Sequence, residues 1–95
     1  MLKLYKFTRY FRRDGTIEGI FIAEPQEVND LIGANIYFGE ALGKHSSISC
    51  VIAKEDIKEL PVSDTTITDL LNVIGSHISG YNPLDYLNSD EEKDQ

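Results

Sequence analysis

The feature that most constrains the fold is an Asp14-Gly15 pair between two stretches rich in strand-forming residues. Residues 2–11 precede the pair and residues 16–23 follow it. Asp and Gly both tolerate the positive φ angles of a two-residue type I′ turn, which suits the twist of paired strands. The sequence therefore predicts an N-terminal β-hairpin, and Gly19 indicates a bulge in its second strand.

Two segments have the spacing of amphipathic helices. Residues 25–32 begin with a proline, which suits the first helical position, and they place Val28 and Leu31 on one face. Residues 64–78 place apolar side chains at one face over three turns, beginning at Ile67. Gly75 lowers helix stability by about 1 kcal/mol relative to alanine, so this second helix is expected to end or bend there.

Two further apolar runs, residues 36–38 and 47–53, predict a second strand pair, and residues 57–62 suit either a fifth strand or a helical turn. The short connections within each pair require antiparallel strands. We therefore expect an α+β two-layer sandwich, with a four- or five-stranded, mainly antiparallel sheet and both helices on one face. The residues expected in the core are Leu4, Phe7, Ile20, Ile22, Val28, Leu31, Ile36, Phe38, Ile48, Cys50, Ile52, Ile67, Leu70, Leu71 and Ile74.

The charge of the chain is −7 at neutral pH and is unevenly distributed. Of the nine basic residues, five lie in residues 1–13, which contain no acid, whereas all sixteen acids lie in residues 14–95. The length of 95 residues suits one domain, which we expect over residues 1–87, followed by an acidic disordered tail over residues 88–95. The single Cys50 fits a reducing compartment, and a cytoplasmic protein without membrane contact is expected.

The connection from Gly39 to Ser47 is the first candidate binding site. It contains a carboxylate, an ammonium group, an imidazole and hydroxyls, and the residues assigned to binding are Glu40, Lys44, His45 and Ser46. The spacing of its glycines differs from that of a phosphate-binding loop, and a strand is expected to follow it rather than a helix. The alternative is an ordinary polar turn in which glycines supply positive φ angles. No catalytic residue, metal site or cofactor is assigned.

The basic N-terminal strand is the second candidate surface. It interleaves aromatic and basic residues, and those assigned to an interface are Lys3, Tyr5, Arg9, Tyr10 and Arg12. If this strand lies at the edge of the sheet, two copies could pair there, with each basic strand facing acids of the other copy in a homodimer. Alternatively, the basic residues pair within their own chain, with Glu18 the nearest candidate. The strongly negative remainder of the chain disfavours nucleic acid as a partner.

These observations favour a small acidic, non-enzymatic binding or regulatory module that modulates or blocks a macromolecular partner, a protein of unknown identity. Compact acidic proteins of this kind occur among bacterial and phage accessory proteins, which is an analogy rather than a derivation. The alternative is a small-molecule-binding protein or minor enzyme that uses the loop from Gly39 to Ser47. A concave pocket on which Lys44 and His45 converge would favour the alternative, whereas a flat surface with clustered carboxylates would favour the binding module.

Overall fold

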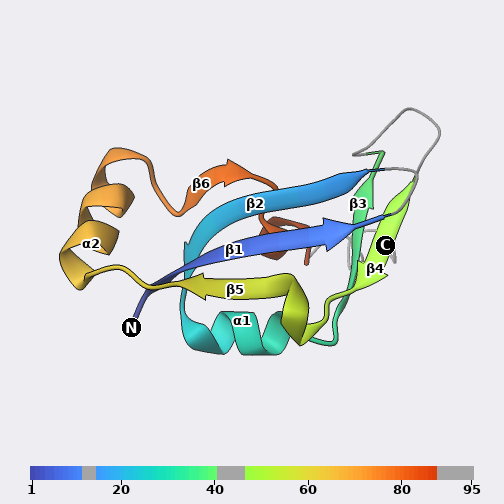
Figure 1. Ribbon diagram of the computed structural model, residues 1–95, viewed down its shortest axis with the longest axis horizontal. Helices are drawn as coiled ribbons and strands as arrows, with labels where there is room; N and C mark the ends of the chain where they lie inside the picture. Colours follow the sequence, from blue (N-terminus) through green and yellow to red (C-terminus); the bar gives the residue numbers. More distant parts are fainter. Residues whose placement is uncertain (12–14, 41–46, 88–95) are drawn as a thin grey trace, which may run out of the picture.

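The computed structural model describes residues 1–11, 15–40 and 47–87, and a long β-hairpin lies at its centre (Figure 1). The hairpin consists of β1 (Lys3–Tyr10) and β2 (Thr16–Ala23). β5 (Ile57–Leu60) pairs with β1 and β6 (His77–Gly80) pairs with β2, so a four-stranded antiparallel sheet has the order β5-β1-β2-β6. The predicted α+β class with a mainly antiparallel sheet is confirmed.

The remaining elements flank this sheet. In chain order they are α1 (Pro25–Leu31), β3 (Asn35–Gly39), β4 (Ile48–Val51), the 3₁₀ helix η2 (Lys54–Asp56), α2 (Asp64–Val73) and the 3₁₀ helix η3 (Pro83–Tyr86). β3 and β4 form a separate two-stranded sheet, so the second hairpin does not extend the main sheet as predicted.

The hairpin register differs from the register that a turn at Asp14-Gly15 requires. A two-residue turn there would place Arg13 opposite Thr16, whereas the structure pairs Tyr10 with Thr16. The Phe11 N–H also donates to the Gly15 carbonyl oxygen at 2.7 Å, so the predicted two-residue turn is wrong. Gly15 does adopt a positive φ of 119°, and Asp14 lies outside the described residues.

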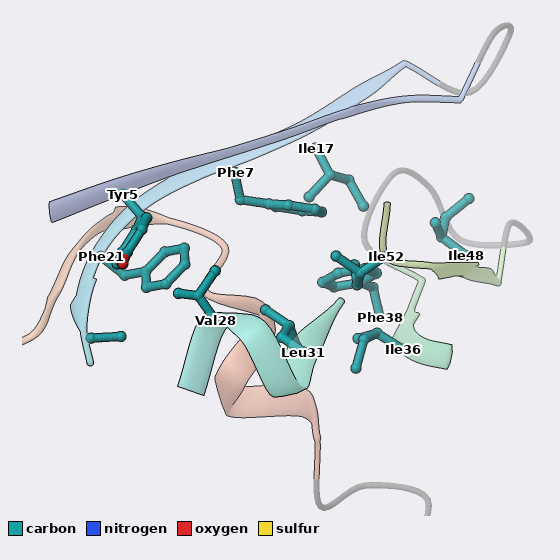
Figure 2. Packing of buried hydrophobic residues seen from close by; sticks show 11 residues of the cluster. Tyr5, Phe7, Ile17, Phe21, Val28, Leu31, Ile36, Phe38, Ile48 and Ile52 are labelled. Atoms are coloured by element: carbon teal, nitrogen blue, oxygen red, sulfur yellow. The ribbon is translucent and has the colours of Figure 1, made fainter. Parts of the chain in front are cut away.

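One face of the β1–β2 hairpin carries the larger part of the core. Tyr5, Phe7, Ile17 and Phe21 project from it, and the rings of Tyr5 and Phe21 stack with their centroids 5.8 Å apart. Figure 2 shows these side chains pointing toward α1 and toward the β3–β4 sheet. The buried residues that those elements contribute are Val28, Leu31, Ile36, Phe38, Ile48 and Ile52.

The opposite face of the same hairpin carries a smaller core against α2. Because side chains alternate along a strand, Leu4 and its cross-strand partner Ile22 point away from Tyr5 and Phe21. Both pack against the buried Ile67 of α2. The two helices therefore lie on opposite faces of the sheet, in contrast to the predicted arrangement on one face.

The buried part of the second face lies at the end of the sheet where β1 begins. Further along β1 this face carries Lys6 and the exposed Thr8, and the Lys6 ammonium lies 3.6 Å from a Glu18 carboxylate oxygen. α2 connects β5 to β6, the two edge strands, and it crosses this face only at the apolar end (Figure 1). As expected, the helix ends just before Gly75, with Val73 as its last residue, and Ile78 of the predicted apolar face instead lies in β6, which pairs with β2 from His77.

A close backbone crossing brings the C-terminal segment from the second face to the first. Gly19 of β2 pairs with Gly80 of β6, and the Tyr81 N–H donates to the Glu18 carbonyl oxygen at 3.0 Å. A Cβ atom on Gly19 would lie 2.0 Å from the Tyr81 carbonyl oxygen, and a Cβ atom on Gly80 would lie 2.2 Å from the Glu18 carbonyl oxygen. Only glycine fits at either position.

Beyond the crossing, aromatic side chains secure the segment to the larger core. Phe38 lies between β1 and η3, with its ring centroid 5.7 Å from that of Phe7 and 4.9 Å from that of Tyr86. Tyr81 approaches Phe38 edge-on at 6.3 Å. These ring contacts hold η3 against β3.

Most of the predicted core is confirmed. Ten of the predicted residues are buried, namely Leu4, Phe7, Ile22, Val28, Leu31, Ile36, Phe38, Ile48, Ile52 and Ile67. Ile20, Cys50, Leu70 and Leu71 are only half-buried, and the prediction for Ile74 is wrong, because its side chain is 53 % exposed. The buried residues of the larger core cluster that were not predicted are Tyr5, Ile17, Phe21 and Ala23, all on the face that packs against α1 and β3–β4.

Replacement of Gly19 by alanine should disrupt the close contact between β2 and the Tyr81 backbone. The added methyl group would overlap the Tyr81 backbone, which cannot move as a flexible side chain can. We expect Gly19→Ala to lower the free energy of unfolding by about 3 kcal/mol or more. Chemical denaturation monitored by circular dichroism would measure the loss.

Gly33→Ala is the matched control for that substitution. Gly33 has a φ of 92°, and a Cβ atom there would have no neighbour within 4 Å. Its replacement should therefore cost only the left-handed backbone penalty of about 1–2 kcal/mol. Equal losses at the two positions would contradict the steric account of Gly19.

Candidate protein-binding site

The structure describes only the two ends of the predicted loop site. Lys44, His45 and Ser46 lie outside the described residues, so the structure does not test whether they converge. Glu40 is exposed directly after β3. On the other side of the loop, the Ser47 and Tyr37 hydroxyl oxygens are 3.3 Å apart.

The predicted basic interface strand is not at an edge. β1 is hydrogen-bonded to β2 along its length and to β5 from Leu4 to Phe7, so over these residues it is not the edge strand that the dimer hypothesis assumed. Tyr5 is 6 % exposed and belongs to the core, whereas Tyr10 is 69 % exposed. Arg12 lies outside the part of the chain that the structure describes.

Basic residues of β1 pair within the chain, which the alternative hypothesis proposed for Arg9, Arg12 and Arg13, the last two of which lie outside the described residues. The Lys3 ammonium lies 3.6 Å from a Glu59 carboxylate oxygen, and Lys6 pairs with Glu18. Arg9 pairs with Asp56 of η2 rather than with Glu18. Adjacent strands and η2 therefore neutralise much of the positive charge that the sequence concentrates in β1.

The Arg9–Asp56 pair joins the main sheet to the end of β4. Arg9 Nη1 also donates to the Val51 carbonyl oxygen at 3.1 Å, and Asp56 Oδ2 accepts from the Ala53 N–H at 2.8 Å. The Asp56 side chain is 12 % exposed, so this pair is shielded from solvent more than the other ion pairs of β1. It fixes the path of the chain between β4 and β5.

Cys50 lies near this pair but is poorly suited to nucleophilic chemistry. Burial raises the pKa of its thiol above the ordinary value of 9.0; Arg9 acts in the lowering direction and Asp56 in the raising direction. A raised pKa keeps the sulfur protonated at neutral pH, and the thiol is a weaker nucleophile than the thiolate. The half-buried Cys50 therefore acts as a packing residue.

We expect the Arg9–Asp56 pair to stabilise the fold more than the exposed Lys6–Glu18 pair. A double-mutant cycle with Arg9→Met and Asp56→Asn should give a coupling energy of at least about 1 kcal/mol, because a charged hydrogen bond is lost from a partly buried site. The same cycle with Lys6→Met and Glu18→Gln should give less than about 0.5 kcal/mol. Similar coupling energies in the two cycles would contradict this expectation, because they would show that the partial burial of Arg9 and Asp56 does not strengthen their ion pair.

A hollow lies beside α2 on the described surface. It has a volume of about 180 Å³ and opens to solvent between the start of β1 and the helix. Its lining residues are Met1, Leu2, Asp64, Ile67, Thr68 and Leu71. Four of these six are apolar, and the polar pair, Asp64 and Thr68, lie one helical turn apart on α2.

The apolar surface of the hollow continues along α2. Ile67 is buried, Leu71 is half-buried, and Ile74, at the C-cap, is 53 % exposed. Exposure thus rises along the helix, because α2 projects past the end of the sheet that it covers (Figure 1). Leu71 and Ile74 are neighbours on the helix surface at a spacing of i, i+3. We call the hollow together with Ile74 the α2 surface.

The α2 surface has a negative rim. Asp64 lies in the first turn of the helix, where its carboxylate is favourable to the helix dipole, and no described residue forms an ion pair with it. The chain has no Lys or Arg between Lys58 and Lys93. On the β1 side of the hollow, the Met1 ammonium pairs with a Glu24 carboxylate oxygen and Lys3 pairs with Glu59.

Other titratable clusters in the described residues are structural. Both ring nitrogens of His77 face acceptors, with Nε2 2.6 Å from the Gly80 carbonyl oxygen and Nδ1 3.4 Å from an Asp85 carboxylate oxygen. This ring holds the crossing segment to η3. Among residues 1–11, 15–40 and 47–87 there is no group of three or more His, Cys, Asp or Glu side chains placed to hold a metal ion.

The apolar helix residues of the α2 surface, Ile67, Leu71 and Ile74, were predicted to lie in the core. The spacing of Ile67, Leu70, Leu71 and Ile74 predicts an apolar face correctly but does not show how much of that face the sheet can cover. The feature that indicates incomplete cover of the helix is the length of the strands next to it, because β5 and β6 have four residues each and offer little surface to the ten-residue α2.

Stability measurements should separate the covered part of α2 from the uncovered part. Ile67→Ala should lower the free energy of unfolding by about 2–5 kcal/mol, because it leaves a cavity against Leu4 and Ile22. Ile74→Ala should change it by about 0.5 kcal/mol or less, because the side chain is mainly in solvent. Urea denaturation would compare them, and a large loss at Ile74 would place that side chain in the core.

The sequence matches no protein-family model, and the comparisons with curated proteins and with solved structures find no match. Among the described residues, each helix is too short or too polar to span a lipid bilayer. The residues of the chain itself are therefore the basis for a functional proposal.

Proposed function

We propose that this chain is a small acidic, non-enzymatic binding module that modulates or blocks a protein partner through the α2 surface. The observation that supports the proposal is the apolar hollow beside α2, continued by an exposed Ile74. An exposed aliphatic side chain next to a concave apolar surface is a common arrangement in protein interfaces. The partner would bury side chains that the sheet leaves in solvent.

The chemistry of the hollow favours binding over catalysis. Its side-chain polar groups are the Asp64 carboxylate and the Thr68 hydroxyl, and the lining residue Met1 adds an ammonium group that pairs with Glu24. Polar groups at the edge of a mainly aliphatic surface orient a bound ligand. The hollow therefore supports the binding hypothesis, whereas the loop on which the enzyme alternative depends lies mainly outside the described residues.

The acidic character of the chain suggests how binding could have a regulatory effect. A net charge of −7 on 95 residues attracts basic surfaces and could compete with a nucleic acid for them. This part of the proposal extends to a cytoplasmic setting, where the single Cys50 would stay reduced.

A comparative capture experiment tests the proposal. The wild-type chain and a Leu71→Gln/Ile74→Gln variant would be immobilised, exposed to an extract of the source cell, and the retained proteins quantified by mass spectrometry. We expect at least one protein to be retained by the wild type and reduced at least tenfold on the variant, since loss of central apolar contacts usually weakens an interface by that much.

The matched control removes two exposed apolar side chains elsewhere. Tyr10 is 69 % exposed and Val51 is 55 % exposed, and neither lines the α2 surface. A Tyr10→Gln/Val51→Gln variant should therefore retain the same protein as the wild type. A retained protein that responds to the control variant but not to the α2 variant would overturn the assignment of the site.

A further inference from the structure

We infer that the occupant of the α2 surface is a basic amphipathic helix of the partner, which places one bulky apolar side chain in the hollow and a Lys or Arg beside Asp64. This inference rests on the proposed function and specifies the chemistry of the partner. Three features support it: the size of the hollow, the charge of its rim and the spacing of the exposed side chains.

The hollow is large enough for one side chain. An apolar cavity of about 150 Å³ in a protein interior holds a benzene molecule, and this hollow has about 180 Å³. A leucine or phenylalanine side chain would contact Leu2, Ile67 and Leu71 there. Because the hollow is open on one side, the backbone carrying that side chain can remain outside it.

The negative charge of Asp64 at the rim favours a basic residue of the partner next to the apolar side chain that enters the hollow. Asp64 lines the hollow without an ion-pair partner among the described residues, and α2 carries a second acid, Asp69, but no basic residue. A second copy of this chain would bring two such acidic helices together, and like charges at an interface are repulsive. The electrostatics therefore favour a basic partner over self-association.

The half-buried Leu71 and the exposed Ile74 have the spacing that a partner helix recognises. Leu71 and Ile74 lie one turn apart along α2, so they form a short ridge beside the hollow. A partner helix packed along α2 can place its own i and i+3 or i+4 residues on either side of this ridge. The hollow then receives one anchor, and Ile74 contacts the next.

A peptide titration tests this inference directly. The probe is a fluorescein-labelled amphipathic peptide of Leu and Lys, about 14 residues long, near the length at which an isolated helix becomes stable in water. An otherwise identical peptide has Glu at every Lys position. We expect fluorescence anisotropy to show binding of the Lys peptide to the full chain, weakened as ionic strength rises from about 0.05 to 0.5 M.

Three variants relate binding to the proposed site. Leu71→Gln should weaken binding of the Lys peptide at least tenfold, because it removes an apolar wall of the hollow. Asp64→Asn should weaken it about two- to fivefold, the contribution of a solvent-exposed ion pair. Asp30→Asn on α1 removes the same charge away from the hollow and should have a smaller effect than Asp64→Asn. Circular dichroism would confirm that each variant is folded.

Several outcomes would overturn the inference. Equal binding of the Glu peptide and the Lys peptide would show that charge does not select the occupant. Equal effects of Asp64→Asn and Asp30→Asn would show that the peptide responds to the net charge of the chain and not to a contact with Asp64. Sedimentation of the chain as a dimer that Ile74→Gln dissociates would assign the surface to a second copy. Absence of Lys-peptide binding, together with a captured protein that depends on Leu71 and Ile74, would reject this partner chemistry and leave the proposed function intact.

Discussion

The fold depends on burial of the β1–β2 hairpin from both sides. Phe7 and Leu4 lie on opposite faces of the same strand, and each is at least nine-tenths buried, Phe7 among α1, β3 and β4 and Leu4 beneath α2. A two-stranded hairpin is marginally stable alone, so its stability must come from elements packed on both faces. Each of the remaining elements that contributes core side chains packs against one of these faces.

Local signals in the sequence predicted the elements better than their arrangement. The apolar spacing of Val28 and Leu31 and the proline before them predict α1, and the helical face from Ile67 predicts α2. The assignment of both helices to one face failed because both Ile22 and Phe21 are apolar. A strand that is apolar on both faces does not indicate which helix covers which face.

The sites were harder to predict because they depend on contacts far apart in sequence. Arg9 and Asp56 are separated by 47 residues, and no local pattern pairs them. Similarly, the hollow forms where Leu2 meets Leu71, and its existence depends on how far α2 extends past the sheet. The edge position expected for β1 failed for the same reason, since only the long-range pairing with β5 places this basic strand inside the sheet.

The position of α2 between the two edge strands has a consequence for local unfolding. Residues 61–63 and 74–76 are short links, so α2 cannot leave the sheet without straining the ends of both β5 and β6. Opening of this segment would also expose Leu4 and Ile22 to water, so we expect residues 57–80 to open as one cooperative unit in hydrogen exchange. A ligand that holds α2 in place would then protect backbone amides at both edges of the sheet from hydrogen exchange, although it contacts neither edge.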